Sequence, residues 1–181
     1  IDIHFNPNAT SAKHIKLKTR AILACGEVVE AWRLFSLGKY NNASNILRKV
    51  VHWFEKNQKT TAFKEAMTYD VLHYVVVKAY RGLAQCEAAK TKDLHLNKHI
   101  KFLNEANKYL ARAEDAVLKY QEADCIEEQL CDCEQIYFDQ LQASFFLSKY
   151  DDRYASMFLK AYGQFMLTEL VILRYLPENF N

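Results

Sequence analysis

The stretch GKYNNASNILRKVV, residues 38–51, joins a helix stop to a helix start in a chain of 181 residues that holds only four glycines. Gly38 follows a helical pattern and suits the left-handed conformation that closes a helix, which a side chain with a Cβ makes costly. A new amphipathic pattern begins at Asn41 or Asn42. The stretch therefore predicts two helices joined by a short turn.

The two helices on either side of this turn have clear limits. The first is predicted over about 11–36, with Ser11 as its N-cap. Its large apolar residues recur at helical intervals at Ile15, Ile22, Cys25, Val29, Trp32 and Leu37. The second, over about 41–57, places on one face Ala43, Ile46, Leu47, Val50 and Phe54. The small side chain of Ala43 permits close approach of the preceding helix.

Four further helical segments are predicted, over about 60–90, 93–121, 124–148 and 151–176. The first of them contains YDVLHYVVVKAY (69–80), a run that is apolar nearly all round and whose β-branched residues also suit a buried strand. We favour a helix because the apolar pattern continues from Phe63 through Cys86 without a turn signal, a length unusual for a strand.

The segments 93–121 and 151–176 differ in pattern. The first has apolar residues spaced by three or four, typical of a core stripe or a coiled-coil seam. The second is apolar on most sides, but Lys160 and Glu169 would each be costly near a bilayer centre, so no membrane span is predicted. Its apolar side chains exceed what one core needs. We therefore expect Phe158, Phe165 and Leu173 to contact an apolar partner or a second copy.

Composition supports one helical domain. Half of the residues are apolar, and four Gly and two Pro leave few places for β-turns or long loops. A chain of this length can fold without a disulfide or a metal. The prediction is an all-α fold of about six antiparallel helices, stacked as hairpins or closed as a bundle. Residues 11–176 form the domain, 1–10 an N-terminal extension and 177–181 a C-terminal tail.

Several residues around the turn also match a known pattern. Small and large residues alternate as in one helix-turn-helix unit at Ala31, Leu34, Gly38, Tyr40, Ala43 and Leu47. Over 27–57 the chain thus resembles the tetratricopeptide repeat family, and SKYDDRYASMFLKAY (148–162) looks like a second copy of the turn and following helix. No 34-residue period is visible, so the resemblance implies a solenoid-like hairpin domain. It also implies scaffolding, with a groove that binds a peptide or protein.

The search for catalytic or metal chemistry is negative. The chain has no phosphate-binding loop, dinucleotide glycine pattern, nucleophile elbow or zinc-protease motif, so we expect no enzymatic activity and no cofactor. His95 and His99 share a helix face and would need two further ligands to hold a metal. Cys125, Cys131 and Cys133 cluster, but the last two point to nearly opposite sides of a helix. We expect no metal site.

Two charged stretches remain. The net charge of +2 gives no strong general attraction to nucleic acid or membrane. The stretch 12–20 is basic, and Lys13, Lys16 and Arg20 are candidate contacts for an acidic ligand. An acidic stretch follows later in the chain at Glu122, Asp124, Glu127, Glu128, Asp132 and Glu134. Solvated surface explains both, although opposite charges could also guide head-to-tail association.

These features favour a non-catalytic interaction module of a larger assembly, which binds a protein or peptide through its grooves or through an exposed apolar helix face. One alternative is a nucleic-acid-associated subunit that uses the basic first helix, with steep salt dependence. Another is a regulatory homodimer formed by the last helix. Five cysteines without framework spacing indicate a reducing compartment, cytoplasmic or nuclear.

Overall fold

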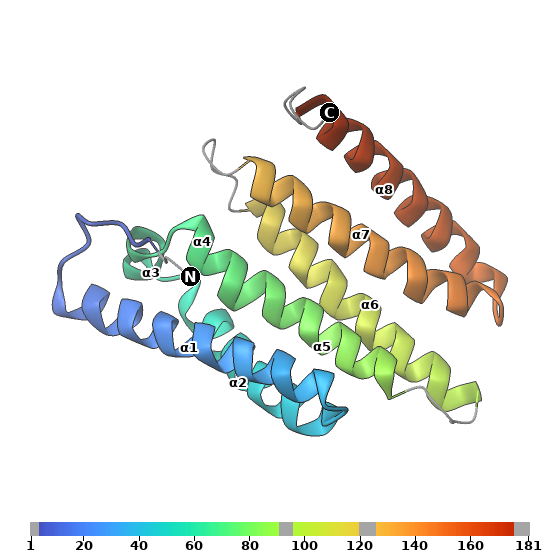
Figure 1. Ribbon diagram of the computed structural model, residues 1–181, viewed down its shortest axis with the longest axis horizontal. Coiled ribbons are helices and arrows are strands. Elements are labelled where there is room, and N and C mark those ends of the chain that lie inside the picture. Colours follow the sequence, from blue (N-terminus) through green and yellow to red (C-terminus); the bar gives the residue numbers. More distant parts are fainter. Residues whose placement is uncertain (1–3, 91–95, 120–125, 176–181) are drawn as a thin grey trace.

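The computed structural model describes residues 4–90, 96–119 and 126–175, which form helices and short connections, with no strand among them (Figure 1). The α-helices are α1 (Ala12–Ser36), α2 (Tyr40–Asn57), α3 (Thr61–Ala66), α4 (Tyr69–Leu72), α5 (Lys78–Ala89), α6 (Leu96–Lys119), α7 (Ile126–Ser148) and α8 (Ala155–Tyr175). A π-helical turn, His73–Val77, joins α4 to α5, and a 3₁₀ turn, Asp152–Tyr154, precedes α8. The predicted all-α class is confirmed.

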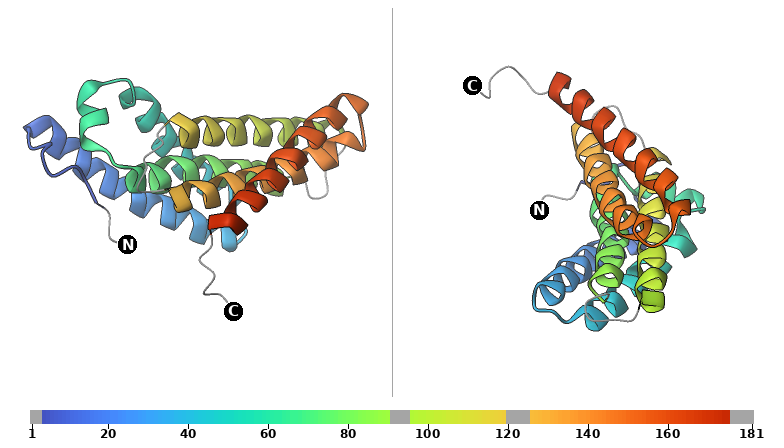
Figure 2. Two further views of the ribbon diagram at one scale, coloured as in Figure 1. Left: turned by 90° about the horizontal axis from the view of Figure 1, so that it is seen from above. Right: turned by 90° about the vertical axis from the view of Figure 1, so that its right-hand side faces the viewer.

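The long helices pack in chain order as an open stack. Each one packs on the next in the series α1, α2, α5, α6, α7 and α8. Helices α1 and α2 lie at one end of the molecule and α8 at the other (Figure 1 and the right view of Figure 2). Of the two predicted architectures, the hairpin stack therefore describes the arrangement, with α1 and α8 as its end helices.

The turn at Gly38 has the predicted conformation. Its φ is 73°, in the left-handed region that glycine adopts without strain. The Gly38 N–H donates to the Phe35 carbonyl at 2.9 Å and the Lys39 N–H donates to the Leu34 carbonyl at 2.9 Å. This pair of bonds is the Schellman motif that closes a helix. Helix α2 then begins at Tyr40, one residue before the predicted start.

The buried face of α1 differs from the one that its large apolar residues suggested. Ile15, Ile22, Val29 and Leu37 are all more than half exposed. The residues that face the core are mostly smaller: Leu17, Ala21, Ala24, Cys25, Val28, Ala31 and Leu34. Small side chains let α2 and α5 approach closely, so the alanine-rich face of α1 lies inside and Ile15, Ile22 and Val29 lie outside.

The predicted single helix over 60–90 is interrupted. Met67 and Thr68 are extended, so α3 ends before α4 begins. Buried Met67 packs into the core, and the Thr68 hydroxyl donates to the His4 carbonyl, which stabilises the corner. No glycine or proline marks this break. After it, α4, the π turn and α5 continue without interruption, and the valines 75–77 are all buried, which confirms the helix preferred over a strand.

Residues 4–10, predicted as an extension, lie against α1 and α3. Ala9 is buried and Phe5 packs on the core. The Asn6 side-chain amide donates to the Glu65 carbonyl at 2.8 Å. The Lys18 ammonium donates to the carbonyls of Asn6 and Ala9, each at 2.7 Å. This segment therefore adds cover at the α1 end of the stack.

The core is concentrated toward the same end. The largest buried cluster is built mainly from α1, α2, α3, the π turn and α5, with smaller contributions from α6 and α7. Helix α6 buries the predicted stripe through Leu103, Ala106, Leu110, Ala113 and Val117. Among the described residues of α8, only Ala161 and Thr168 are buried. The last helix thus rests on α7 with most of its surface open.

Candidate interaction surface

The face of α8 that points away from α7 is apolar. Five residues spaced by three or four line it, and we call them the outer stripe: Leu159, Tyr162, Met166, Leu170 and Leu173. Their exposed fractions range from 41% to 65%. The buried Ala161 and Thr168 lie on the opposite side of the helix. A helix that is apolar all round normally has neighbours on both sides, so the outer stripe lacks a cover among the described residues.

A second apolar feature follows the line where α7 and α8 meet. We call it the aromatic row: Phe138, Phe145, Phe158, Tyr162 and Phe165. The ring centroids of Phe138 and Phe165 are 5.8 Å apart, and those of Phe145 and Phe158 are 5.7 Å apart. Phe158 stacks on Tyr162 at 6.4 Å, which joins the row to the outer stripe. Each ring is half-buried or exposed, so the row is open to a partner.

One carboxylate holds the helices beneath these surfaces. Glu114 on α6 accepts from the Tyr137 hydroxyl and from the Gln164 amide, each at 3.1 Å, and from Gln140 at 3.3 Å. Burial and the nearby Glu114 charge raise the pKa of Tyr137 well above its usual range, so its hydroxyl stays a donor. Because the carboxylate links α6, α7 and α8, it fixes how α7 and α8 present the aromatic row.

Two acidic side chains tie α7 to the preceding hairpin. Asp132 accepts from the Tyr69 hydroxyl at 2.8 Å and contacts Nδ1 of His73. Asp139 pairs with the Arg81 guanidinium at 2.9 Å. Burial raises the pKa of Asp139, although the Arg81 charge acts in the opposite direction. The expectation that Asp132 belongs to a solvated acidic surface is wrong, because Asp132 is 4% exposed and pairs internally.

The predicted basic contacts on α1 divide into two kinds. Lys13 and Lys16 are exposed. The Arg20 guanidinium instead pairs with Glu27 at 2.9 Å and lies over the Trp53 ring at 5.4 Å. With the Lys18 ammonium also held by backbone carbonyls, two of the four cations in this stretch remain open to a ligand.

The predicted apolar contacts are on α8 but not on one surface. Phe158 and Phe165 belong to the aromatic row and are half-buried against α7. Leu173 lies on the outer stripe and is 63% exposed. Other members of the two surfaces were not singled out from the sequence: Phe138, Phe145, Leu159, Tyr162, Met166 and Leu170. The usable signal was the lack of a polar face on the last helix.

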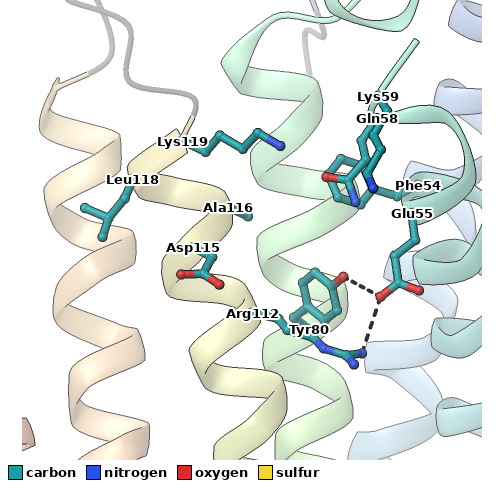
Figure 3. Close-up of a pocket in the computed structure, with 10 residues that line it drawn as sticks. All are labelled: Phe54, Glu55, Gln58, Lys59, Tyr80, Arg112, Asp115, Ala116, Leu118 and Lys119. Atoms are coloured by element: carbon teal, nitrogen blue, oxygen red, sulfur yellow. Dashed lines mark hydrogen bonds and ion pairs between the residues drawn. The ribbon is translucent and has the colours of Figure 1, made fainter.

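A large cleft of about 760 Å³ opens between α2, α5 and α6 (Figure 3). Glu55 lies between two donors there: the Tyr80 hydroxyl at 3.0 Å and the Arg112 guanidinium at 3.3 Å. Burial and the Glu55 charge raise the pKa of Tyr80. Lys59 and Asp115 also line the cleft, so its charges are mixed. The lining contains no cysteine, serine or histidine that would form a nucleophile and base pair.

A smaller cavity of about 300 Å³ lies between α5, α6 and α7. Four alanines in its wall leave the space: Ala84, Ala88, Ala106 and Ala143. Phe146 also lines it and contacts Phe145 of the aromatic row, with ring centroids 6.0 Å apart. The cavity therefore has room for an apolar side chain.

The candidate metal ligands do not converge within the described residues. The His99 ring packs on Tyr150 at 5.9 Å between centroids, while His95 and Cys125 lie outside the described residues. Burial raises the pKa of Cys133 to about 11, and Cys131 is exposed. Over residues 4–90, 96–119 and 126–175, no group of three or more possible ligands forms.

The remaining comparisons concern membranes and known proteins. None of the helices within the described residues is both long and apolar enough to cross a bilayer. Comparison of the chain with protein-family models, curated proteins and solved structures gave no match. The class of protein is therefore defined by its own structure, an open stack of helical hairpins with an apolar end helix.

Proposed function

We propose that this chain is a non-catalytic protein interaction module that contacts a protein partner through its α7–α8 end. The outer stripe carries the proposal, because five large apolar side chains in one row are exposed on the face of α8 that points away from α7. Each Å² of apolar surface removed from water contributes roughly 25 cal/mol. Covering the stripe would therefore favour association, whereas scattered exposed leucines need no partner.

The aromatic row supports the same role. Aromatic side chains at the centre of a contact commonly contribute most of its binding energy. Phe145 and Phe158 are positioned by a packed hairpin and by the Glu114 carboxylate, so little conformational freedom is lost when they bind. An apolar helix laid along this line, or a peptide with an apolar anchor for the neighbouring cavity, fits the surface.

The nucleic-acid alternative has less support. Of the basic residues on the first helix, Lys13 and Lys16 are open, whereas Lys18 and Arg20 have intramolecular partners. A phosphate-binding surface normally uses a larger cluster of cations, and its affinity falls steeply with salt. Free Cys25 and Cys86 in the core support an intracellular, reducing location, cytoplasmic or nuclear.

The proposal is tested with immobilised protein and native extract. The double variant Leu159→Glu/Leu173→Glu places charges on the outer stripe, and Leu23→Glu on α1 is the control, because Leu23 is exposed to a similar degree. A discrete protein retained by the unmodified chain and by the control, but lost from the double variant, supports the module. If the retained protein is instead lost after nuclease treatment, or is lost with Lys13→Glu/Lys16→Glu but not with the α8 double variant, the nucleic-acid alternative is supported.

A further inference from the structure

We infer that the outer stripe of α8 pairs with the outer stripe of a second copy of this chain, with the two α8 helices antiparallel. The inference rests on the proposed interaction function and names the partner of that surface. Two observations support it: the area of the stripe and the order of large and small residues along α8.

The exposed area is sufficient for a specific dimer. A large side chain buries on the order of 150–200 Å² when it is fully covered. At the observed exposures, the outer stripe and the adjacent Leu167 offer on the order of 600 Å² per copy. Two copies would bury roughly 1,200 Å², which reaches the range of stable protein interfaces before any polar rim is added.

Two positions of the outer stripe, Leu159 and Leu170, match in reversed order. When two α8 helices lie antiparallel about a point midway between Gly163 and Met166, Leu159 of one copy lies opposite Leu170 of the other, and Gly163 lies opposite Met166. A Cβ at Gly163 would meet no atom within 4 Å, so there is room beside it for the methionine. Large side chains facing small ones give dense packing. The midpoint is also near the middle of α8, so most of the helix overlaps.

A parallel pair would be poorer. It places Gly163 opposite Gly163 of the second copy and leaves a void, while Met166 meets Met166.

The antiparallel pair also closes. Because both copies use the same surface, a two-fold axis relates them and assembly stops at two. Helix α1 exposes Ile15, Ile22 and Val29 at the other end of the stack. A contact between α1 of one copy and α8 of the next would use different surfaces and build a closed ring of several copies or an open filament. The antiparallel α8 dimer and the α1-to-α8 assembly therefore differ in mass.

The first experiment is sedimentation of the full chain over a range of concentrations. The unmodified protein is expected to have twice the monomer mass. Leu170→Glu places two unpaired carboxylates in the apolar contact and should weaken the dimer by about 100-fold or more. The matched variant Leu23→Glu, exposed to 59% against 56% for Leu170, should remain a dimer. Circular dichroism and the melting temperature check that both variants are folded.

The second experiment tests the antiparallel register. Leu159→Lys and Leu170→Glu are each expected to be monomeric alone. When the two variants are mixed, they should form a heterodimer, because the introduced ammonium of one chain then lies opposite the introduced carboxylate of the other. At the other pair of positions in the same heterodimer, the unmodified Leu170 of the Leu159→Lys chain lies opposite the unmodified Leu159 of the Leu170→Glu chain. Recovery of the dimer on mixing supports the antiparallel register, and two folded monomers that do not pair overturn it.

The remaining outcomes separate this inference from the proposed function. A monomeric unmodified chain, a mass that rises without limit, or a dimer dissociated by Leu23→Glu but not by Leu170→Glu overturns self-pairing through α8. If the monomer still retains a different protein from extract and Leu159→Glu/Leu173→Glu abolishes this, the interaction function stands while the second copy is excluded as the partner.

Discussion

The two ends of the stack differ in how their outer helices are covered. At the α1 end, residues 4–10 and the short helix α3 pack beside α1, and the largest core cluster lies beneath them. At the other end, α8 packs on α7, and its described residues have Ala161 and Thr168 as their buried members. In a hairpin stack an end helix needs either a polar outer face or a cover. Over its described residues, helix α8 has no polar outer face.

The outer faces of α1 and α8 differ in pattern as well. On α1, exposed Ile15 and Ile22 are separated along the same face by Thr19, and Arg33 pairs with Glu30 near its end. On α8, the outer stripe has no charged member from Leu159 to Leu173. An interrupted apolar face tolerates water better than a continuous one. The difference is the reason for proposing α8, rather than α1, as the contact helix.

The largest expected effect lies in the core near α1. Leu47 is 1% exposed between α2 and α5, and Leu47→Ala should lower the free energy of unfolding by about 3 kcal/mol. The matched variant Leu167→Ala on α8, where the leucine is 65% exposed, should change it by less than about 0.5 kcal/mol at monomer concentrations. Urea unfolding measures both. Equal losses would show that α8 is packed as tightly as the core.

The next effect concerns the attachment of α7. Asp132→Ala removes the acceptor of Tyr69 and the partner of His73, both within a buried cluster, and should cost about 2 kcal/mol. Asp115→Ala, at an exposed position of the neighbouring helix α6, is the control and should be near neutral. If thermal unfolding finds the two variants alike, the Asp132 cluster does not stabilise the α7 end.

A smaller effect, with opposite signs, is expected at two glycines near α1. Gly38→Ala forces a residue with a Cβ into a left-handed conformation and should cost about 1 kcal/mol. Gly26→Ala, inside α1 and with no atom within 4 Å of the new Cβ, should instead gain up to about 1 kcal/mol from helix propensity. If the denaturant midpoints of both variants shifted in the same direction, the assignment of the left-handed turn to Gly38 would be contradicted.

The smallest effect is the pH dependence from Asp139. Because burial raises its pKa above the unfolded value, the folded protein binds this proton more tightly than the unfolded chain. Its contribution is therefore present below the unfolded pKa, about 4, and is lost as the pH rises through the folded pKa. The stability of the unmodified protein relative to Asp139→Asn should increase as the pH falls from neutral. If this difference in stability decreased as the pH fell, folding would lower the pKa of Asp139 and the prediction would be wrong.

Much of the fold follows from local sequence. The Gly38 turn and the faces of α2 and α6 were predictable because glycine conformation and amphipathic spacing are local properties. The break at Met67 was missed because tertiary contacts, including the bond from Thr68 to the His4 carbonyl, replace a glycine or proline signal. The buried face of α1 was missed because both of its faces are apolar, so periodicity does not choose between them.

The interaction surface was predictable only in part. An excess of apolar residues on the last helix predicted a contact region with Phe158, Phe165 and Leu173 as candidates, and the structure places all three on α8. The sequence could not separate the aromatic row from the outer stripe, because that division depends on which side of α8 faces α7. The sequence also does not show which cations are paired within the fold. Arg20 was therefore proposed as a contact, although its guanidinium pairs with Glu27 and lies over the Trp53 ring.

The most direct test of the contact surface is hydrogen exchange of the backbone amides, compared between the dilute chain and the chain saturated with its partner. The account predicts that exchange slows most along α8, next along α7 near the aromatic row, and remains unchanged in α1 and α2. Slowing centred on Lys13 and Lys16 of α1, or no slowing in α8 when the partner is bound, would contradict it.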